Sequence, residues 1–457
     1  MAYAFTFDAS ACSGCKACQE ACKDKNNLPV GVLWRRVIEV SGGEWTAQNG
    51  AWKNTVFAYN LSIACNHCEH PKCAGVCPTD AYIQREDGIV YIDPSKCIGC
   101  GYCAWACPYN APRYNFELGQ MSKCNFCFDN IDAGLPPSCV AACPMRVLNF
   151  VEIDGGPWTV DHGQPSTVHG QWSELWALPA NEHPFPLPTL SRTEPHLMVK
   201  SHVAMSNSLE KVIGNTEEIK PKKQKSEASL VAFTLLTQMS VGMAWAGLWM
   251  VDSLSLIPYL LIGVCLAVGG FFSFAHLGAK RNAWRAPFHL KKSWLSREIL
   301  SAGIFGASWL AGIFVPEIKW VTALMGAVFV YSMAKVYRLH VMPAWDTWRT
   351  TAGFFVTAAL LGHAVMLIVF STRSGGLAVL ALLVVELTLM LSAKSESRWS
   401  GTSLRLGLIL ASLGTGILLL ASNPPGVWIS PVLFLLIAAE EIVGRVLFYT
   451  ALEERPL

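Results

Sequence analysis

The feature that most constrains this chain is the placing of its cysteines. Sixteen of its seventeen cysteines lie between Cys12 and Cys143, whereas Cys265 stands alone in an apolar stretch, where packing explains it. Cysteines at this density indicate disulfides or metal, depending on the compartment. No apolar run precedes Cys12 and none follows Arg35-Arg36, so we expect no export signal and reduced thiols. The cysteines are therefore expected to bind metal.

The spacing of the cysteines indicates which metal they bind. They form four runs of four, and the first and third runs have the Cys-x2-Cys-x2-Cys-x3-Cys spacing of bacterial ferredoxins. The second and fourth runs lengthen only the middle spacing. Zinc ribbons also use paired Cys-x2-Cys units, but four complete quartets, three of them ending in Cys-Pro, favour 4Fe-4S clusters. The predicted ligands are Cys12, Cys15, Cys18, Cys22, Cys65, Cys68, Cys73, Cys77, Cys97, Cys100, Cys103, Cys107, Cys124, Cys127, Cys139 and Cys143.

Short elements are expected between these ligands. The alternation in residues 88–93 predicts a strand, and Ala17 to Lys25 and Ala104 to Cys107 are expected to form short helices. We therefore predict an α+β fold, a duplicated 4Fe-4S ferredoxin-like domain over residues 1–154.

Two segments carry no predicted ligand. The insertion 28–60 contains Trp34, Trp45 and Trp52, which are expected to pack within the domain or to face a partner subunit. Residues 155–226 are rich in Pro, Ser, His and Trp without sustained periodicity, and we expect an extended tail over the ferredoxin surface. Its histidines are expected to be ordinary surface residues: His162, His169, His183, His196 and His202.

The cysteine motifs resemble those of a known family. Residues 1 to about 200 are similar to the four-cluster ferredoxin subunit of the molybdopterin oxidoreductases, a group that includes dimethyl sulfoxide, polysulfide and nitrate reductases and formate dehydrogenase. In nitrate reductases a Trp replaces one cysteine of the third run and leaves a 3Fe-4S centre. This chain has Cys100 there, so the resemblance implies four 4Fe-4S clusters.

The resemblance also implies how the cysteines are shared between clusters. Three cysteines of each run hold one cluster, and the fourth comes from another run. The implied sets are Cys12, Cys15, Cys18 with Cys143; Cys124, Cys127, Cys139 with Cys22; Cys97, Cys100, Cys103 with Cys77; and Cys65, Cys68, Cys73 with Cys107.

The composition changes sharply near residue 227, after which Leu, Ala, Ile, Val and Gly dominate. Apolar segments of about 17 to 24 residues are long enough to cross a bilayer as helices. The net charge of +2, without a basic stripe, gives no sign of a nucleic-acid partner. We predict an all-α polytopic bundle over residues 227–457 with eight transmembrane helices, near 228–251, 255–277, 298–315, 318–337, 351–371, 376–393, 403–422 and 427–449.

Lys and Arg in the connecting loops predict the orientation, because they resist translocation. They gather in the loops on the side of the N-terminus, among which we count Arg405, while the opposite side shows only Lys319 and Arg373. We expect a multi-pass protein of the inner (cytoplasmic) membrane with the ferredoxin domain on the cytoplasmic side.

The apolar half resembles the membrane anchor subunit of the dimethyl sulfoxide reductase type, which also has eight spans. The best match runs from His276-Leu277-Gly278 to Ser293-Trp294-Leu295-Ser296-Arg297-Glu298, where that family's histidine and glutamate are implicated in quinol binding. The resemblance implies a quinone site at His276, Arg297 and Glu298, for menaquinone or ubiquinone. Because charges at helix ends also anchor helices, a purely anchoring role for these residues stays open.

Other ionisable residues in the apolar half are weaker candidates. His363, Glu386, Glu440 and Glu441 lie inside predicted spans and indicate a proton route or interhelical pairing. Haem b needs paired axial histidines, and His363 has no evident partner at its depth, so no haem is expected.

Together these features predict the electron-transfer and anchor subunit of a quinone-linked oxidoreductase. The resemblance implies a separate catalytic subunit that holds a molybdenum bis-pterin cofactor, as in dimethyl sulfoxide reductase. An alternative is the same role in a sulfite dehydrogenase that reduces quinone. Two further alternatives are an ion pump, which the gathering of ionisable residues at one edge disfavours, and a tether without a quinone site.

Overall fold

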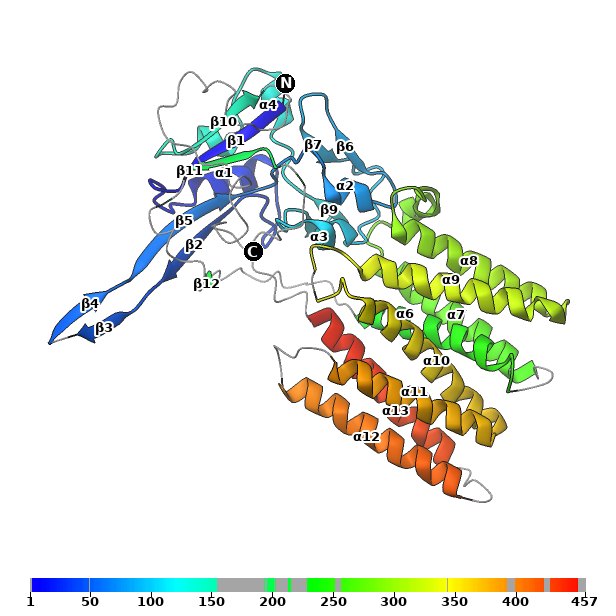
Figure 1. Cartoon of the computed structure of the whole chain (residues 1–457). Coiled ribbons are helices and arrows are strands. Elements are labelled where there is room, and N and C mark those ends of the chain that lie inside the picture. The colour runs from blue at the N-terminus through cyan, green and yellow to red at the C-terminus, as the bar shows by residue number, and fades with distance from the viewer. Residues whose placement is uncertain are drawn as a thin grey trace. The chain divides into compact units, whose positions relative to one another are not determined.

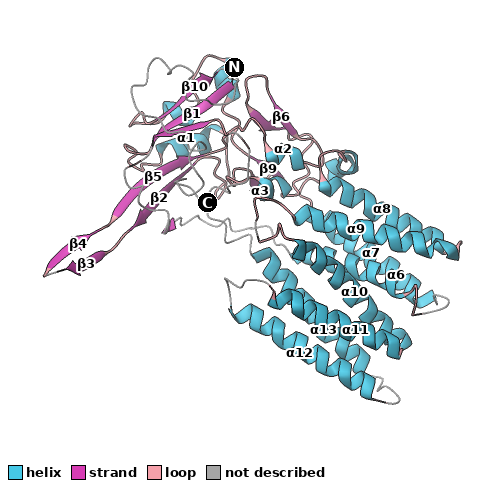
Figure 2. Ribbon diagram, in the orientation of Figure 1, coloured by secondary structure: helices cyan, strands magenta, loops and turns pink. Residues whose placement is uncertain are grey.

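The computed structural model describes residues 2–48, 50–153, 193, 195–200, 202, 213–214, 228–250, 256–342, 344–392, 399–422 and 428–450. The chain divides into two compact units, the first built mainly from Met1–Gln224 and the second from Lys225–Lys280 and Trp284–Arg455. The first unit contains short strands and short helices, and the second is helical throughout its described part (Figure 2).

The first unit is an α+β domain of small sheets and one- to three-turn helices. Its elements are β1 (Ala2–Asp8), α1 (Ala17–Lys25), β2 (Arg36–Gly42), β3 (Trp45–Gln48), β4 (Ala51–Asn54), β5 (Phe57–Ile63), α2 (Lys72–Val76), β6 (Tyr82–Gln84), β7 (Val90–Ile92), α3 (Tyr102–Ala106), β8 (Arg113–Asn115), β9 (Gln120–Ser122), α4 (Phe128–Asp132), α5 (Ser138–Ala141), β10 (Leu148–Ile153), β11 (Leu197–Lys200) and β12 (Ile213–Gly214). The helix predicted over Ala17–Lys25 is confirmed as α1. The helix predicted over 104–107 appears as α3, and the strand predicted over 88–93 appears as β7.

The ends of the ferredoxin sequence meet in one sheet. Strand β1 pairs with β10 antiparallel and with β11 parallel, and Phe5 lies opposite Phe150. Helix α1 packs against α5, while α2 packs against α3. The first cysteine run is therefore next to the fourth, and the second is next to the third.

The insertion 28–60 forms a long hairpin. Strands β2 and β5 pair antiparallel from Arg36 opposite Ile63 to Gly42 opposite Phe57, and the hairpin continues as β3 and β4 (Figure 1). Trp45 and Trp52 are 60% and 71% exposed near its end. Only Trp34 meets the packing expectation, since its Nε1 donates to Ser122 Oγ at 3.0 Å.

Parts of the predicted tail are built into the first unit. Strand β11 extends the β1 sheet, and β12 pairs antiparallel with β2. The expectation of a surface histidine is wrong for His196, which is 3% exposed and whose Nε2 lies 3.4 Å from Glu69 Oε2. His202 stacks on Tyr59 with ring centroids 5.4 Å apart. His162, His169 and His183 lie outside the described residues.

The second unit contains, in its described part, helices of 19 to 23 residues that begin within a few residues of the predicted segments. Six of them are long and apolar enough to cross a membrane, with mean hydropathy of 1.3 to 2.2. The other two helices are α8, which carries Arg297 and Glu298, and α13, which carries Glu440, Glu441 and Arg445. The helices are α6 (Ala228–Ala246), α7 (Leu256–His276), α8 (Trp294–Gly312), α9 (Lys319–Tyr337), α10 (Trp348–Phe370), α11 (Arg373–Leu391), α12 (Trp399–Ala421) and α13 (Ile429–Thr450), with 3-10 turns at Lys280–Phe288 and Pro316–Ile318.

Helices α6 and α10 cross closely because both lack a side chain at the crossing, and a Cβ on Gly242 would lie 1.7 Å from the Ala358 carbonyl oxygen. The assignment of Arg405 to a loop is wrong, since helix α12 begins at Trp399 and contains it. The helix begins four residues before the predicted span 403–422, and Arg405 lies within its first two turns.

Candidate functional site

Each Cys-x2-Cys turn in the first unit has the same backbone conformation. The residue before the second cysteine has a positive φ in all four runs: 69° at Gly14, 42° at His67, 68° at Gly99 and 61° at Phe126. This conformation turns backbone N–H groups toward the preceding sulfur, so the N–H groups of Gly99 and Phe126 each lie 3.4 Å from the Sγ of the first cysteine of their run. Such turns form concave sites for anionic groups, including iron-sulfur clusters.

Two of these positions hold side chains that disfavour a positive φ. Phe126 is fully buried and stacks on Phe5 with ring centroids 4.1 Å apart. The Nδ1 of His67 accepts a hydrogen bond from the Val90 backbone N–H at 3.0 Å. Left-handed backbone costs an ordinary residue about 1–2 kcal/mol, and the burial of these rings offsets it.

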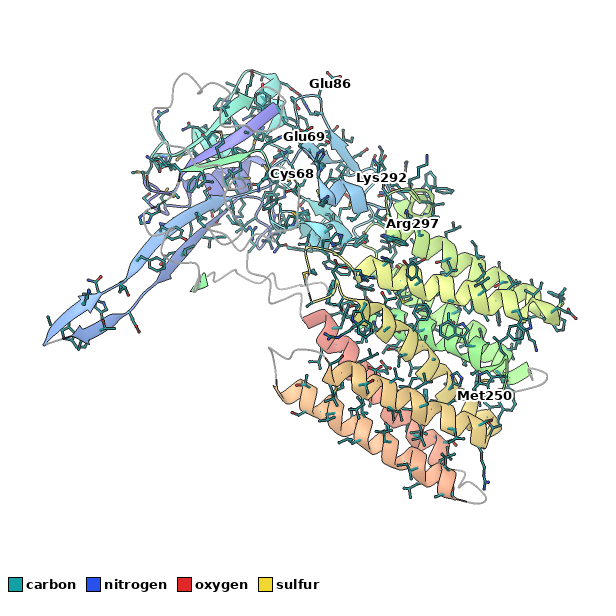
Figure 3. All side chains as sticks on the ribbon, in the orientation of Figure 1. Cys68, Glu69, Glu86, Met250, Lys292 and Arg297 are labelled. Atoms are coloured by element: carbon teal, nitrogen blue, oxygen red, sulfur yellow. The ribbon has the colours of Figure 1, made fainter. Side chains whose placement is uncertain are left out.

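Two cavities in the first unit are lined by cysteines from different runs. One is lined by Cys12, Cys15 and Cys18 and, from the fourth run, Cys143. The other is lined by four cysteines of the second and third runs, Cys65, Cys68, Cys73 and Cys107. Figure 3 marks Cys68 beside Glu69 in the second run. Each cavity thus receives three cysteines from one run and one from another.

The remaining eight cysteines form two further groups, which their electrostatic interactions identify. Burial raises the pKa of Cys103 well above its ordinary value, and the thiolates of Cys100, Cys97 and Cys77 raise it further. Burial also raises the pKa of Cys22 to about 12, with Cys139 and Cys127 adding to the shift. Cys124 interacts with Cys22 and Cys139, and also with Cys65 of the neighbouring group.

The cysteine groups fit a cluster better than a single ion. Among the residues that the structure describes, no three His, Cys, Asp or Glu side chains are placed to hold one metal ion. A zinc ion needs its sulfurs within about 2.3 Å of the metal, and no three of the described cysteines are placed so closely around one point. Thiols with raised pKa values stay protonated near neutral pH unless a metal displaces the proton, so iron binding and folding are coupled.

Two buried cations lie among the cysteine groups. Burial by itself lowers the pKa of Lys123, but the thiolates of Cys65, Cys73 and Cys124 raise it above its usual value. The Lys123 ammonium donates to the carbonyl oxygens of Val90 and Cys124. Arg35, which donates to Ser62, is held charged in the same way by Cys139 and Cys124 against the effect of burial. Lys123 thus lies beside cysteines of the second and fourth runs, and Arg35 beside cysteines of the first and fourth runs. Buried cations at these places compensate the negative charge of thiolate-bound clusters.

The three predicted quinone residues lie where α7 ends and α8 begins. The Nδ1 of His276 lies 3.1 Å from the Ser229 hydroxyl oxygen. Glu298 is 3% exposed, and its Oε1 has no hydrogen-bond partner. Arg297 and Lys292 lie at the N-terminal end of α8 (Figure 3), where the Arg297 guanidinium donates to the carbonyl oxygens of Leu290 and Lys291. Arg297 therefore holds the loop before α8 in place. Glu298 has a carboxyl oxygen that remains able to accept a hydrogen bond.

The weaker sequence candidates separate into two places. His363 on α10 is bound to the Ala359 carbonyl at 2.7 Å and packs on Trp249. Glu386, Glu440 and Glu441 are buried together around the guanidinium of Arg405. The sequence could not reveal this grouping, since the residues belong to three helices.

Two family descriptions match the sequence in succession. Residues 56–153 match the 4Fe-4S dicluster domain, and residues 223–406 match the DMSO reductase anchor subunit (DmsC). The B subunit of the anaerobic dimethyl sulfoxide reductase of Escherichia coli (strain K12) is 44% identical over 198 residues, which are 43% of this chain and 88% of that protein. The protein belongs to the family of dimethyl sulfoxide reductase B subunits. It joins a unit like that subunit to an anchor unit in one polypeptide.

Other relatives of the first unit have related names. The B subunit of the Haemophilus influenzae dimethyl sulfoxide reductase is 40% identical over 220 residues, covering 48% of this chain and 98% of that protein. The thiosulfate reductase electron transfer subunit PhsB of Salmonella typhi is 40% identical over 153 residues, covering 33% of this chain and 77% of that protein. Similarity to the B subunits supports the iron-sulfur character of the cysteine groups, and the DmsC match together with the apolar helices makes the second unit a membrane anchor.

Replacing Lys123 with methionine is expected to lower the midpoint potential of the nearest cluster. The reduced cluster carries one more negative charge, which the buried ammonium stabilises. At an effective dielectric constant of about 20, losing one such charge at short range shifts the potential by roughly a hundred millivolts. Redox titration followed by electron paramagnetic resonance measures the shift. Lys53→Met on the exposed strand β4 is the control. An equal shift of the potential in both variants would contradict a specific role of the Lys123 ammonium in stabilising the reduced cluster.

Proposed function

We propose that this chain passes electrons between membrane quinone and a separate molybdopterin catalytic subunit through four 4Fe-4S clusters. The observation that carries the proposal is the grouping of cysteines from different runs around common cavities. The proposed ligand sets are those implied by the family resemblance, with Cys22, Cys77, Cys107 and Cys143 each serving the cluster of another run. Four clusters, rather than two, are supported by the four separate groups of cysteines.

The proposed catalytic partner acts on a sulfur compound. The relatives are named as subunits of reductases of dimethyl sulfoxide, thiosulfate and tetrathionate. These names favour quinol oxidation by this chain and reduction of the substrate by the partner. Purification of the intact complex from solubilised membranes tests this, since the proposal requires a large second subunit that contains molybdenum.

The proposed membrane unit spans the inner membrane eight times. Six of the proposed spans are the apolar helices, and the other two are α8 and α13. The charged side chains of α8 and α13 are mostly buried against other helices. The positions of Lys and Arg in the loops support a cytoplasmic ferredoxin unit. We further propose domain limits of 1–154, 155–226 and 227–457.

The proposed quinone site uses His276 and Glu298. The burial of Glu298 and its unpartnered Oε1 support a carboxyl group that can accept a proton from a bound quinol. His276 ends α7 and can hydrogen-bond to a quinone oxygen. Arg297, bound to loop carbonyls, is proposed to hold the α7–α8 loop in place for both.

Glu298→Gln is expected to slow quinol-dependent cluster reduction by roughly a hundredfold, because the amide cannot accept the quinol proton. Stopped-flow absorbance of the clusters after mixing with quinol measures the rate. Glu317→Gln, at an exposed position between α8 and α9, is the matched control and should leave the rate unchanged. A normal rate in Glu298→Gln would favour the tether alternative.

A further inference from the structure

Helices α11, α12 and α13 share a buried ionic contact. The Arg405 guanidinium on α12 donates from Nε to Glu440 Oε1 on α13 at 2.5 Å and from Nη2 to Glu386 Oε1 on α11. Both carboxyl groups are buried. One guanidinium thus joins three helices within the anchor unit.

A second arginine completes the group. Arg445 on α13 is buried, donates to Gln238 Oε1 on α6 at 2.8 Å, and lies 4.0 Å from the centre of the Phe354 ring on α10. Glu441 accepts a hydrogen bond from the Thr357 hydroxyl of α10 at 2.9 Å and interacts electrostatically with the other charged members. The polar cluster is defined here as Glu386, Glu440, Glu441, Arg405, Arg445 and Gln238.

The helices are shaped to accommodate the cluster. A Cβ on Gly444 would lie 2.8 Å from the guanidinium carbon of Arg405, so glycine at this position lets that side chain lie between α12 and α13 without a shift. Gln238, although fully buried, has an Nε2 group without a hydrogen-bond partner. A packed interior leaves few such groups unpaired unless a further polar species occupies the site.

The charges of the cluster do not balance. Its three carboxylates and two guanidiniums sum to one negative charge if all are ionised. An unbalanced charge inside an apolar bundle is strongly unfavourable. Each carboxyl group also retains one oxygen without a partner, namely Glu386 Oε2, Glu440 Oε2 and Glu441 Oε1. One added proton on these oxygens makes the cluster neutral.

A pair of hydrogen-bonded tyrosines is near both Glu298 and Arg445 of the polar cluster. The Tyr449 hydroxyl on α13 donates to the Tyr337 hydroxyl on α9 at 2.6 Å, and both side chains are buried. Tyr337 interacts electrostatically with Glu298 on α8 and with Arg445. Hydroxyl groups in this position can both accept and donate a proton.

We propose that Glu386, Glu440 and Glu441 together hold one exchangeable proton, and that Tyr449 and Tyr337 connect this proton store to Glu298. In the exchange a proton leaves a carboxyl of the cluster, Tyr449 and Tyr337 each accept one proton and donate another, and the Glu298 carboxylate receives one. No electron moves in this step. The use of the store in quinone chemistry rests on the proposed function, but its existence does not.

Infrared spectroscopy of the full chain in lipid tests the store through the carbonyl band of a protonated carboxyl group, which shifts in heavy water. Glu386→Gln, Glu440→Gln and Glu441→Gln should each abolish the cluster's band, because two carboxylates then balance two guanidiniums. Gln238→Glu adds a fourth carboxyl and should enlarge the band. Glu298→Gln should leave the cluster's band in place, which separates the two sites.

The proposal is overturned if the band survives in any of the three glutamine variants. The connection to Glu298 is tested by Tyr449→Phe, which keeps the charges and removes the hydroxyl. The band should then persist but exchange with heavy water at least severalfold more slowly, and exchange at the unmodified rate would exclude the tyrosine route. The quinone site is tested separately, because a normal rate of quinol oxidation in Glu298→Gln would contradict that proposal and leave the proton store unaffected.

Discussion

Replacing Cys68 with alanine is expected to remove one cluster and to reduce electron transfer from quinol to background. Cys68 lines a cavity with Cys65, Cys73 and Cys107, and burial followed by these three thiolates raises its pKa well above the ordinary value. Without a fourth thiolate the group cannot hold a 4Fe-4S cluster, so electrons can no longer pass through the proposed series of four clusters. Because metal binding contributes to folding, the variant should also be less stable.

Iron analysis and electron paramagnetic resonance of the anaerobically purified protein measure the loss of one 4Fe-4S signal. About a quarter of the iron is lost if the whole cluster is missing, and a 3Fe-4S signal replaces the lost one if three irons stay bound. Cys265→Ala supplies the control, since this buried cysteine of α7 lies in the other unit and belongs to none of the groups. Full iron content and an unchanged rate in Cys68→Ala would mean that the second run does not hold a cluster.

The turns within each cysteine run could be predicted from the sequence, whereas the runs that lie next to one another could not. Spacing within about ten residues identifies the turns, because each ligand loop is a local structure. The pairing of the first run with the fourth depends on β1 lying between β10 and β11, a long-range arrangement that only the family resemblance suggested. The positive φ values at His67 and Phe126 were also beyond prediction, since their support comes from the distant residues Val90 and Phe5.

The apolar half was predictable in outline for a different reason. Helices in lipid must satisfy their own backbone hydrogen bonds, so hydropathy alone located their approximate limits. Hydropathy says nothing about which helices are neighbours. The partners that Arg405 has on α11 and α13 could therefore not be inferred from the sequence.

Replacing Arg405 with methionine is expected to destabilise the anchor unit by about 3–5 kcal/mol, the usual effect of removing one partner from a buried ion pair. Glu386 and Glu440 would each lose the donor that holds them between helices. For a unit of about this size, such a loss lowers the melting temperature by on the order of 10 °C. Thermal unfolding of the detergent-solubilised protein, followed by circular dichroism, measures it.

The destabilisation expected in Arg405→Met comes from buried carboxylates left without a cationic partner. Lost packing contributes little, because methionine retains much of the apolar stem of arginine. The triple variant Arg405→Met, Glu386→Gln, Glu440→Gln removes the charges together and should recover most of the stability, since neutral replacement of a whole buried ion pair is often tolerated. Arg373→Met, at the exposed start of α11, should change the melting temperature little. If the triple variant is as unstable as Arg405→Met alone, the contact acts through shape, and charge balance does not govern this part of the bundle.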